Sequence, residues 1–225
     1  MTTAAHTPNP TSSPARRGAR FGSPLPGRII LAAGLLCTAC ALAFAASALH
    51  DRRRPLPRYG HVPDFRFIDE RGAPFTTGSL LGQVSVVDFV FTRCTASCPR
   101  LTSTMAQLQT WMNGVGSHAR LVSFSVDPEN DTPDVLKAYA ARAHADSARW
   151  AFVTGPADDV ERAVVLGFKV SAAKFAAGAH DYDVTHGNWL VLVDARGDLR
   201  GYYASDESGA LDRLKADVLK LERAE

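Results

Sequence analysis

The apolar residues along the chain separate a leader from a region of alternating strands and helices. Residues 29–49 form an uncharged run of 21 residues, in which Ala and Leu would surround a whole helix and leave no polar face. At about 1.5 Å per residue, such a helix spans roughly 30 Å, the thickness of a bilayer core. From about residue 60, short runs of strand-forming residues alternate with segments of helical apolar spacing. The pattern predicts a membrane-spanning segment followed by a folded domain.

The clearest signal in the folded region is Val84–Thr92, a β-branched and aromatic run long enough for a central buried strand. A helix is predicted over Pro99–Met112, where apolar residues recur at helical spacing. The remaining predicted strands are Phe65–Asp69, Pro74–Thr77, Leu121–Val126, Trp150–Val153, Trp189–Asp194 and Leu199–Ala204. Further helices are predicted after the N-cap Thr132, over Asp158–Leu166 and over Leu211–Leu221. This order implies an α/β fold with a central mixed β-sheet flanked by helices, parallel at first and antiparallel at the end. The thioredoxin architecture has that order.

The formal net charge of +2 hides a division between the two regions. Residues 1–50 hold four arginines and no acid, and residues 51–58 add four arginines against Asp51. Residues 59–225 hold 17 basic and 22 acidic residues, a net charge of −5. The basic charge therefore belongs to the leader, and it is no argument for nucleic-acid binding by the folded domain.

A basic stretch before an apolar run is typical of a signal anchor or a signal peptide. We expect a basic leader at 1–28, a transmembrane signal anchor at 29–49, a linker at 50–62 and a thioredoxin-like domain at 63–225. Ala46-Ser47-Ala48 could serve as a cleavage site, so a cleaved signal peptide stays open.

The composition favours a bacterial origin and an extracytoplasmic location for the folded domain. Arg outnumbers Lys 20 to 5 and Ala is abundant, which we interpret as the product of a GC-rich bacterial genome. An acid-free, Arg-rich leader is also compatible with a mitochondrial transit peptide. We predict a single-pass protein of the bacterial inner membrane, with its domain in the periplasm or on the outer face. Four cysteines are too few for a disulfide framework.

Two of those cysteines, Cys94 and Cys98, form a C-x-x-x-C motif between the best strand and a helix. Pro99 suits the first helical position, which places Cys98 near the helix N-terminus. A helix N-terminus stabilises a thiolate, so we expect a lowered pKa there. Two converging thiolates can form a disulfide or hold a soft metal ion such as Cu(I).

Asp88 lies in the middle of the predicted buried strand, six residues before Cys94. A buried carboxylate is costly unless it has a partner or a role. Thioredoxins have a buried Asp at that spacing, where it assists proton transfer to and from the thiols. Asp88 therefore indicates redox activity, while a solvent-facing Asp at a strand edge is the structural alternative.

Three separated segments resemble the Sco/SenC family of thioredoxin-fold, membrane-anchored copper proteins. They are VVDFVFTRCTASCP around the cysteines, VSFSVDPENDTPDVLKAYA at residues 122–140, and Tyr182-Asp183-Val184-Thr185-His186 before the strand WLVLVD. The resemblance covers about residues 60–222. It implies copper, as Cu(I) or Cu(II), bound by Cys94, Cys98 and His186. His180 lies six residues before His186 but outside the motif.

Several other residues of the domain are expected to lie outside the metal site. We expect Asp127, Asp131 and Pro133 to shape their loop and cap the following helix rather than bind metal. His118 and His144 are expected to be surface residues with no part in the site.

The resemblance implies a copper metallochaperone rather than an enzyme. Such a protein would receive copper from other copper chaperones and deliver it to the binuclear copper centre of cytochrome c oxidase subunit II. One alternative is a thiol-disulfide oxidoreductase that reduces the oxidase cysteines, with Cys94 and Cys98 as the redox pair and Asp88 as their helper. Another alternative is a redox or copper sensor. The chain has no Pro after Pro156, so the cis-Pro that borders the substrate groove of thioredoxin-type enzymes has no counterpart.

Overall fold

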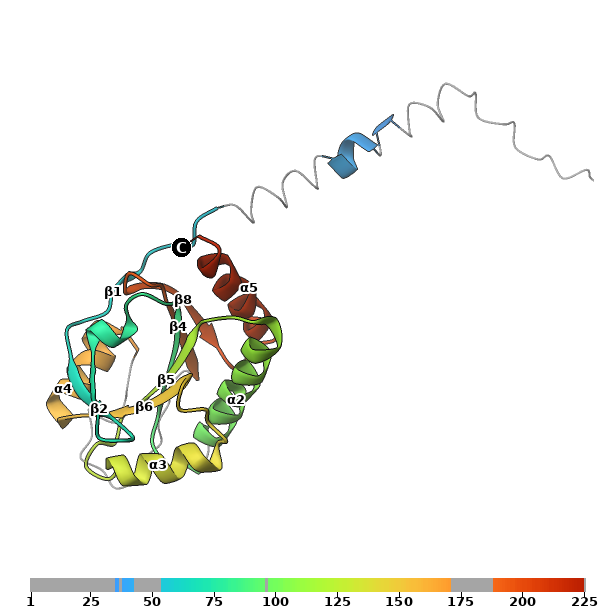
Figure 1. The fold of residues 1–225 in the computed structure, drawn as a ribbon. Helices are drawn as coiled ribbons and strands as arrows, with labels where there is room; N and C mark the ends of the chain where they lie inside the picture. The colour runs from blue at the N-terminus through green and yellow to red at the C-terminus, as the bar shows by residue number, and fades with distance from the viewer. Residues whose placement is uncertain (1–34, 37, 43–53, 96, 171–187, 225) are drawn as a thin grey trace, which may run out of the picture. The chain divides into compact units, whose positions relative to one another are not determined.

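The computed structural model describes residues 35–36, 38–42, 54–95, 97–170 and 188–224 (Figure 1). The chain divides into two compact units, Met1–Arg54 and Pro55–Glu225. In the first unit the described residues before position 43 are helical and exposed. No helix in the described part of the chain is both long enough and apolar enough to cross a membrane. Most of the apolar run at 29–49 lies outside the described residues.

The second unit contains a single mixed sheet with helices packed against it (Figure 1). Among the described residues its strands follow the order β1-β8-β7-β4-β5-β6-β2-β3. The strands are β1 (Gly60–His61), β2 (Arg66–Asp69), β3 (Pro74–Thr76), β4 (Ser85–Val90), β5 (Arg120–Ser125), β6 (Trp150–Thr154), β7 (Trp189–Val193) and β8 (Asp198–Ala204). The helices are η1 (Thr77–Leu80), α2 (Cys98–Val115), α3 (Pro133–Arg142), α4 (Ala157–Arg162), η2 (Ala163–Gly167) and α5 (Ala210–Glu222).

The centre of the sheet is parallel and its later half is antiparallel, as the order of elements predicted. Strands β4, β5 and β6 run parallel, joined by α2 and α3. Strand β7 then pairs antiparallel with β4, and β8 pairs antiparallel with β7. The carboxyl ends of the parallel strands therefore meet at one edge of the sheet, where the loop after β4 leads into α2.

Strand β4 is the centre of the core, because it is paired on both sides and almost entirely buried. An aromatic cluster covers the neighbouring strands, and Phe124 of β5 lies in its middle. The ring centroid of Phe124 is 5.4 Å from that of Phe65 and 5.2 Å from that of Phe168. Helices α2 and α5 lie side by side (Figure 1), with Lys215 Nζ 5.8 Å from the centre of the Trp111 ring. The sheet and these helices give the loop after β4 a rigid base.

Most predicted boundaries lie within two residues of the observed ones, and two of the predicted helices differ in a further respect. Helix α2 begins at Cys98 with Ser97 as its N-cap, so Pro99 occupies the second helical position and not the first. That position also tolerates proline, because the first four amides of a helix have no partner within it. The helix predicted over Asp158–Leu166 is an α-helix only to Arg162, and it continues as the π-helical segment η2.

Candidate metal centre

The structure brings the two cysteines together where β4 ends and α2 begins. Cys94 lies in the connecting loop, and its Sγ accepts a hydrogen bond of 3.4 Å from the backbone N–H of Cys98. Neither cysteine is part of a disulfide; Cys94 is partly exposed and Cys98 only 4 % exposed. The loop itself is tightened by a hydrogen bond from the amide of Cys94 to the carbonyl of Phe91. One accessible and one buried sulfur thus share the N-terminus of a helix, in reach of a single soft metal ion.

Burial has the largest effect on the proton of Cys98. Desolvation, followed by the contact with the Cys94 thiol, raises the pKa of Cys98 to about 12. The expectation of a pKa lowered by the helix N-terminus is therefore wrong, because the cost of burying a thiolate exceeds the stabilisation that the helix provides. At neutral pH Cys98 is a neutral thiol, and a metal ion that binds it must displace its proton.

Asp88 lies in the interior, so a position facing solvent is excluded. The residue is 0 % exposed in the middle of β4, and its Oδ1 accepts a 2.5 Å hydrogen bond from the hydroxyl of Ser123 in β5. The indole Nε1 of Trp150 donates to the same hydroxyl over 2.9 Å. The other carboxylate oxygen, Oδ2, has no hydrogen-bond partner among the described residues. Burial raises the pKa of Asp88 to about 7, so the carboxyl titrates near neutral pH.

Asp88 and the thiols belong to one electrostatic environment under α2. The charge on Asp88 is one of the causes that raise the pKa of Cys98. It also contributes, after burial, to the raised pKa of Tyr139 in α3, which is about 12. The Tyr139 hydroxyl lies 2.7 Å from the hydroxyl of Thr102 in α2, which links the two helices beside the thiols. A proton change at one group therefore affects the others.

A second set of polar contacts holds the residues that precede Cys94. Asp131, buried in the loop after β5, accepts hydrogen bonds from the amide and the hydroxyl of Thr92, the latter over 2.6 Å. It also accepts from the Ser125 hydroxyl over 2.6 Å. Asp127 pairs with Arg93, with 2.8 Å between its Oδ2 and Nη2. Both aspartates shape the loop as expected, and they do so by anchoring the segment that carries Cys94.

The N-cap of the following helix also agrees with its prediction. The Thr132 hydroxyl accepts a hydrogen bond of 3.5 Å from the amide of Val135, and Pro133 occupies the first position of α3.

The predicted histidine ligand, His186, lies outside the described residues, and so does His180. His118 and His144 are exposed, as expected. In the described part of the chain no three His, Cys, Asp or Glu side chains are grouped so as to hold a metal ion. Among the described residues, Cys94 and Cys98 are thus the two predicted ligands that the structure brings together.

The sequence did not reveal the partners of Asp88 or the contacts that hold the loop carrying Cys94. Ser123 contacts Asp88, and Trp150 contacts Ser123, only because the parallel strands bring them together. Arg93 stands beside Cys94 in the sequence, and this adjacency was the one available signal for its role. Its pairing with Asp127, 34 residues later, is a product of the fold.

The chain matches known proteins over the whole second unit. The SCO1/SenC family model matches residues 54–221. A relative from Stutzerimonas stutzeri named "Putative copper-binding protein" is 31% identical over 201 residues, which are 87% of this chain and 96% of that protein.

Two solved structures are also similar. One is a SCO1/SenC family lipoprotein from Bacillus anthracis str. Ames, 30% identical with a TM-score of 0.67, covering 76% of this chain and 98% of that one. The other is BsSco, described as a member of the Sco family of cytochrome c oxidase assembly proteins, in which a disulfide switch was identified. It is 29% identical with a TM-score of 0.64, over 76% of this chain and 98% of that one.

The pKa of Asp88 predicts how stability depends on pH. The value rises from 3.8 in the unfolded chain to about 7 in the fold, so the folded state binds this proton more tightly. The free energy of unfolding should therefore fall as the pH rises from about 4 to about 7, and stay reduced above that. Asp88→Asn removes this decline, and it should be about 2–4 kcal/mol more stable than the wild type at pH 8 but similar at pH 4.

Urea unfolding of both proteins between pH 4 and pH 8 measures the difference. Asp134→Asn, at an exposed position of α3, is the matched control and should follow the wild type. Parallel pH profiles for the wild type and Asp88→Asn would contradict the assignment of this pH dependence to Asp88.

Asp131→Ala tests the anchor of the cysteine loop. The substitution leaves the part-buried donors of Thr92 and the buried hydroxyl of Ser125 without their acceptor, so it should cost about 2–4 kcal/mol of unfolding free energy. Asp134→Ala at the exposed first turn of α3 should cost less than about 1 kcal/mol. Urea unfolding at pH 7 measures both, and equal losses would show that Asp131 has no special role.

Proposed function

Because the chain belongs to the SCO1/SenC family, we propose that it binds copper and acts in the assembly of cytochrome c oxidase. The observation that carries the proposal is the pair of free thiols at the start of α2. Thiolates are soft ligands that favour Cu(I) over the harder divalent ions. The relative named "Putative copper-binding protein", which aligns with 87% of this chain, supports the same metal.

The ligand set that we propose is Cys94, Cys98 and His186. Two thiolates suit Cu(I), and an added imidazole lets the same site hold Cu(II). The contact between the cysteines supports their joint role, and the part of His186 comes from the Y-x-V-x-H motif. The Asp131 and Asp127 contacts would keep the Cys94 loop in place while copper enters and leaves.

Copper is the cargo of this protein in our proposal. The protein would receive copper from other copper chaperones and transfer it to the binuclear copper centre of cytochrome c oxidase subunit II. The similarity to a member of a family of oxidase assembly proteins supports an oxidase as the recipient. The partial exposure of Cys94 supports transfer as well, because a partner ligand must reach the metal before the last sulfur releases it.

The similarity to a lipoprotein supports a membrane-associated bacterial protein. We propose that residues 29–49 are a single-pass anchor in the inner membrane and that the domain works on its outer face. The uncharged run and the basic residues before it support this topology.

A copper titration tests the proposal. The full chain, reduced and held in a neutral detergent, should bind one equivalent of Cu(I) or Cu(II), and the Cu(II) form should show a thiolate-to-copper absorption band. Cys94→Ser and Cys98→Ser should each weaken copper binding by more than roughly 10–100-fold, which is the cost of losing a residue that contacts a metal ligand but not the metal. His186→Ala should change the Cu(II) spectrum and weaken the binding of Cu(II) more than that of Cu(I).

The matched controls are Cys40→Ser and His144→Ala, which remove an exposed cysteine and an exposed histidine and should leave binding unchanged. The absence of tight 1:1 binding would refute the copper site. An unaltered Cu(II) spectrum in His186→Ala would refute the third ligand.

One observation favours a second activity, the reduction of the oxidase cysteines by the same thiols. Asp88 has a titrating carboxyl with a free Oδ2 close enough to affect the pKa of Cys98. In such a reaction Cys94 and Cys98 lose two electrons and two protons as they form a disulfide, and the disulfide of the partner is reduced to two thiols. Asp88 could accept the proton of the buried thiol.

A kinetic comparison tests this activity. An oxidised peptide carrying the copper-site cysteines of subunit II should be reduced by the wild type, and Cys94→Ser should abolish the reaction. Asp88→Asn should slow it by roughly 10–100-fold near pH 7 and remove a step in the pH profile. His186→Ala should react at the wild-type rate. If Asp88→Asn matches the wild type at every pH, Asp88 has no part in proton transfer.

A further inference from the structure

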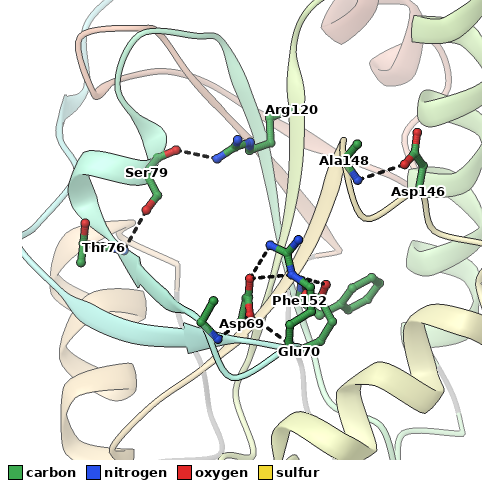
Figure 2. Close-up of polar contacts among 10 residues, drawn as sticks. Asp69, Glu70, Thr76, Ser79, Arg120, Asp146, Ala148 and Phe152 are labelled. Carbon is green, nitrogen blue, oxygen red and sulfur yellow. Dashed lines mark hydrogen bonds and ion pairs between the residues drawn. The ribbon is translucent and has the colours of Figure 1, made fainter.

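A cavity of about 170 Å³ lies at the opposite end of the parallel strands from the thiols. It is bordered by the first residues of β5 and β6, whereas Cys94 follows the last residues of β4. Strand β2 pairs with β6 only at Asp69↔Val153 and Ile68↔Thr154. Closer to the start of β6 the sheet opens, and the amide of Phe152 bonds the Glu70 carboxylate over 3.0 Å (Figure 2). The opening between β6 and η1 forms the cavity.

The cavity is positively charged. Three arginines line it, namely Arg71, Arg120 and Arg149, and Asp69 is the one acidic residue in its lining. Arg71 forms an ion pair with Asp69, in which Nε and Nη2 donate to Oδ2 over 3.1 and 2.6 Å. No carboxylate of the described residues lies within 4 Å of the Arg120 or Arg149 guanidinium. Arg71 Nε also lies 3.6 Å from the carboxylate of Glu70, which is outside the lining. Arg120 and Arg149 therefore keep their charges without a paired carboxylate among the described residues.

The two unbalanced arginines are held in place by neutral carbonyl groups. Arg120 donates from Nη1 to the Ser79 carbonyl over 2.8 Å (Figure 2). With the Gln83 amide oriented so that its oxygen accepts, Arg120 also donates to it from Nε and Nη2, over 2.9 and 3.0 Å. Arg149 donates from Nη1 to the carbonyls of Ser117 and Ala119, both over 2.8 Å. Its Nε and Nη2 donate to no described residue. Both side chains are partly buried and thus preorganised, and the Arg149 guanidinium has an edge available for a further acceptor.

We propose that this cavity binds a small oxyanion of the phosphate or sulfate type. A guanidinium offers two parallel N–H donors that match such an anion, and fixed donors lose little entropy on binding. The anion would also balance two like charges that the fold has placed together, and burial and Arg71 lower the pKa of Arg120 there. Neither the copper site nor the thiol reaction uses these residues, so the proposal stands independently of both.

Two sources offer this chemistry, a free anion in solution and the phosphate of a lipid headgroup. A lipid headgroup is relevant because the chain enters the domain near the amino ends of the parallel strands, where the cavity also lies. Arg200 donates to the carbonyls of Leu56 and Pro57 and pairs with Asp194. Asp194 follows β7, whose last residue, Val193, pairs with the first residue of β4.

Binding to the copper-free full chain, in a neutral detergent at constant ionic strength, tests the proposal. The probes are inorganic phosphate, sulfate and dihexanoyl phosphatidylglycerol below its micellar concentration, each followed by calorimetry. We expect saturable 1:1 binding with a Kd of about 0.1–1 mM for at least one probe. Binding of phosphate or sulfate identifies a free anion as the ligand, and binding of the lipid alone identifies a headgroup.

The variants Arg120→Gln and Arg149→Gln should each weaken that binding at least about tenfold. Arg149→Lys keeps the charge but loses the planar fork, so it should give an intermediate affinity. Arg71→Gln, at a side chain that is 56% exposed, should also weaken binding, because it leaves the Asp69 charge without its partner in the cavity. Arg162→Gln, which removes an equal charge from α4 outside the cavity, is the control and should bind like the wild type.

Far-UV circular dichroism and urea unfolding of each variant confirm that the domain is folded. If none of the three probes binds saturably to the wild type, the proposal is wrong. It is equally wrong if folded Arg149→Gln and Arg71→Gln bind with wild-type affinity. Because the assay contains no copper, a failure here leaves the proposed copper function untouched, and a failure of copper binding leaves this result unaffected.

Discussion

The parallel pairing of β4 with β5 is the constraint on which the site depends. Its register places Asp88 opposite Ser123 and ends with Val90 opposite Ser125. That alignment lets Ser123 donate to Asp88, and it brings Asp131, just beyond β5, to the amide of Thr92. A slip of one residue would turn every side chain of the strand to the opposite face. The hydrophobic core, to which Cys98 itself belongs, thus sets the position of the Cys94 loop.

The same burial that fixes the loop sets the chemistry of the thiols. A helix N-terminus favours a thiolate, but Cys98 is so well buried that its pKa rises. Asp88 is affected in the same way, and its raised pKa makes the carboxyl a proton acceptor near neutral pH. A neutral, protected thiol beside an accessible one suits a site that takes up a soft metal ion in exchange for protons. Cys94, in contrast, is partly exposed, so its sulfur is accessible from solvent.

Much of the fold was predictable because its elements have strong local signals. The run from Val84 to Thr92 became β4, and Thr132 capped α3 as its hydroxyl suggested. Asp127 and Asp131 shape the loop as predicted, but the cap of α3 is Thr132 and neither aspartate. Long-range consequences were harder to foresee. The expected low pKa of Cys98 was wrong, because exposure is decided by elements far away in the sequence.

The sequence by itself determined the order of the elements, the division into a basic leader and an acidic domain, and the C-x-x-x-C motif that resembles a copper family. These follow from periodicity, charge and spacing, which are properties of neighbouring residues. Only the tertiary structure decided that Asp88 is buried with a free oxygen, that Cys98 is a protected thiol, and that Arg71, Arg120 and Arg149 surround one cavity. The reason is physical: burial and charge pairing depend on which strands become neighbours, and residues as far apart as Arg71 and Arg149 meet only when the sheet has formed.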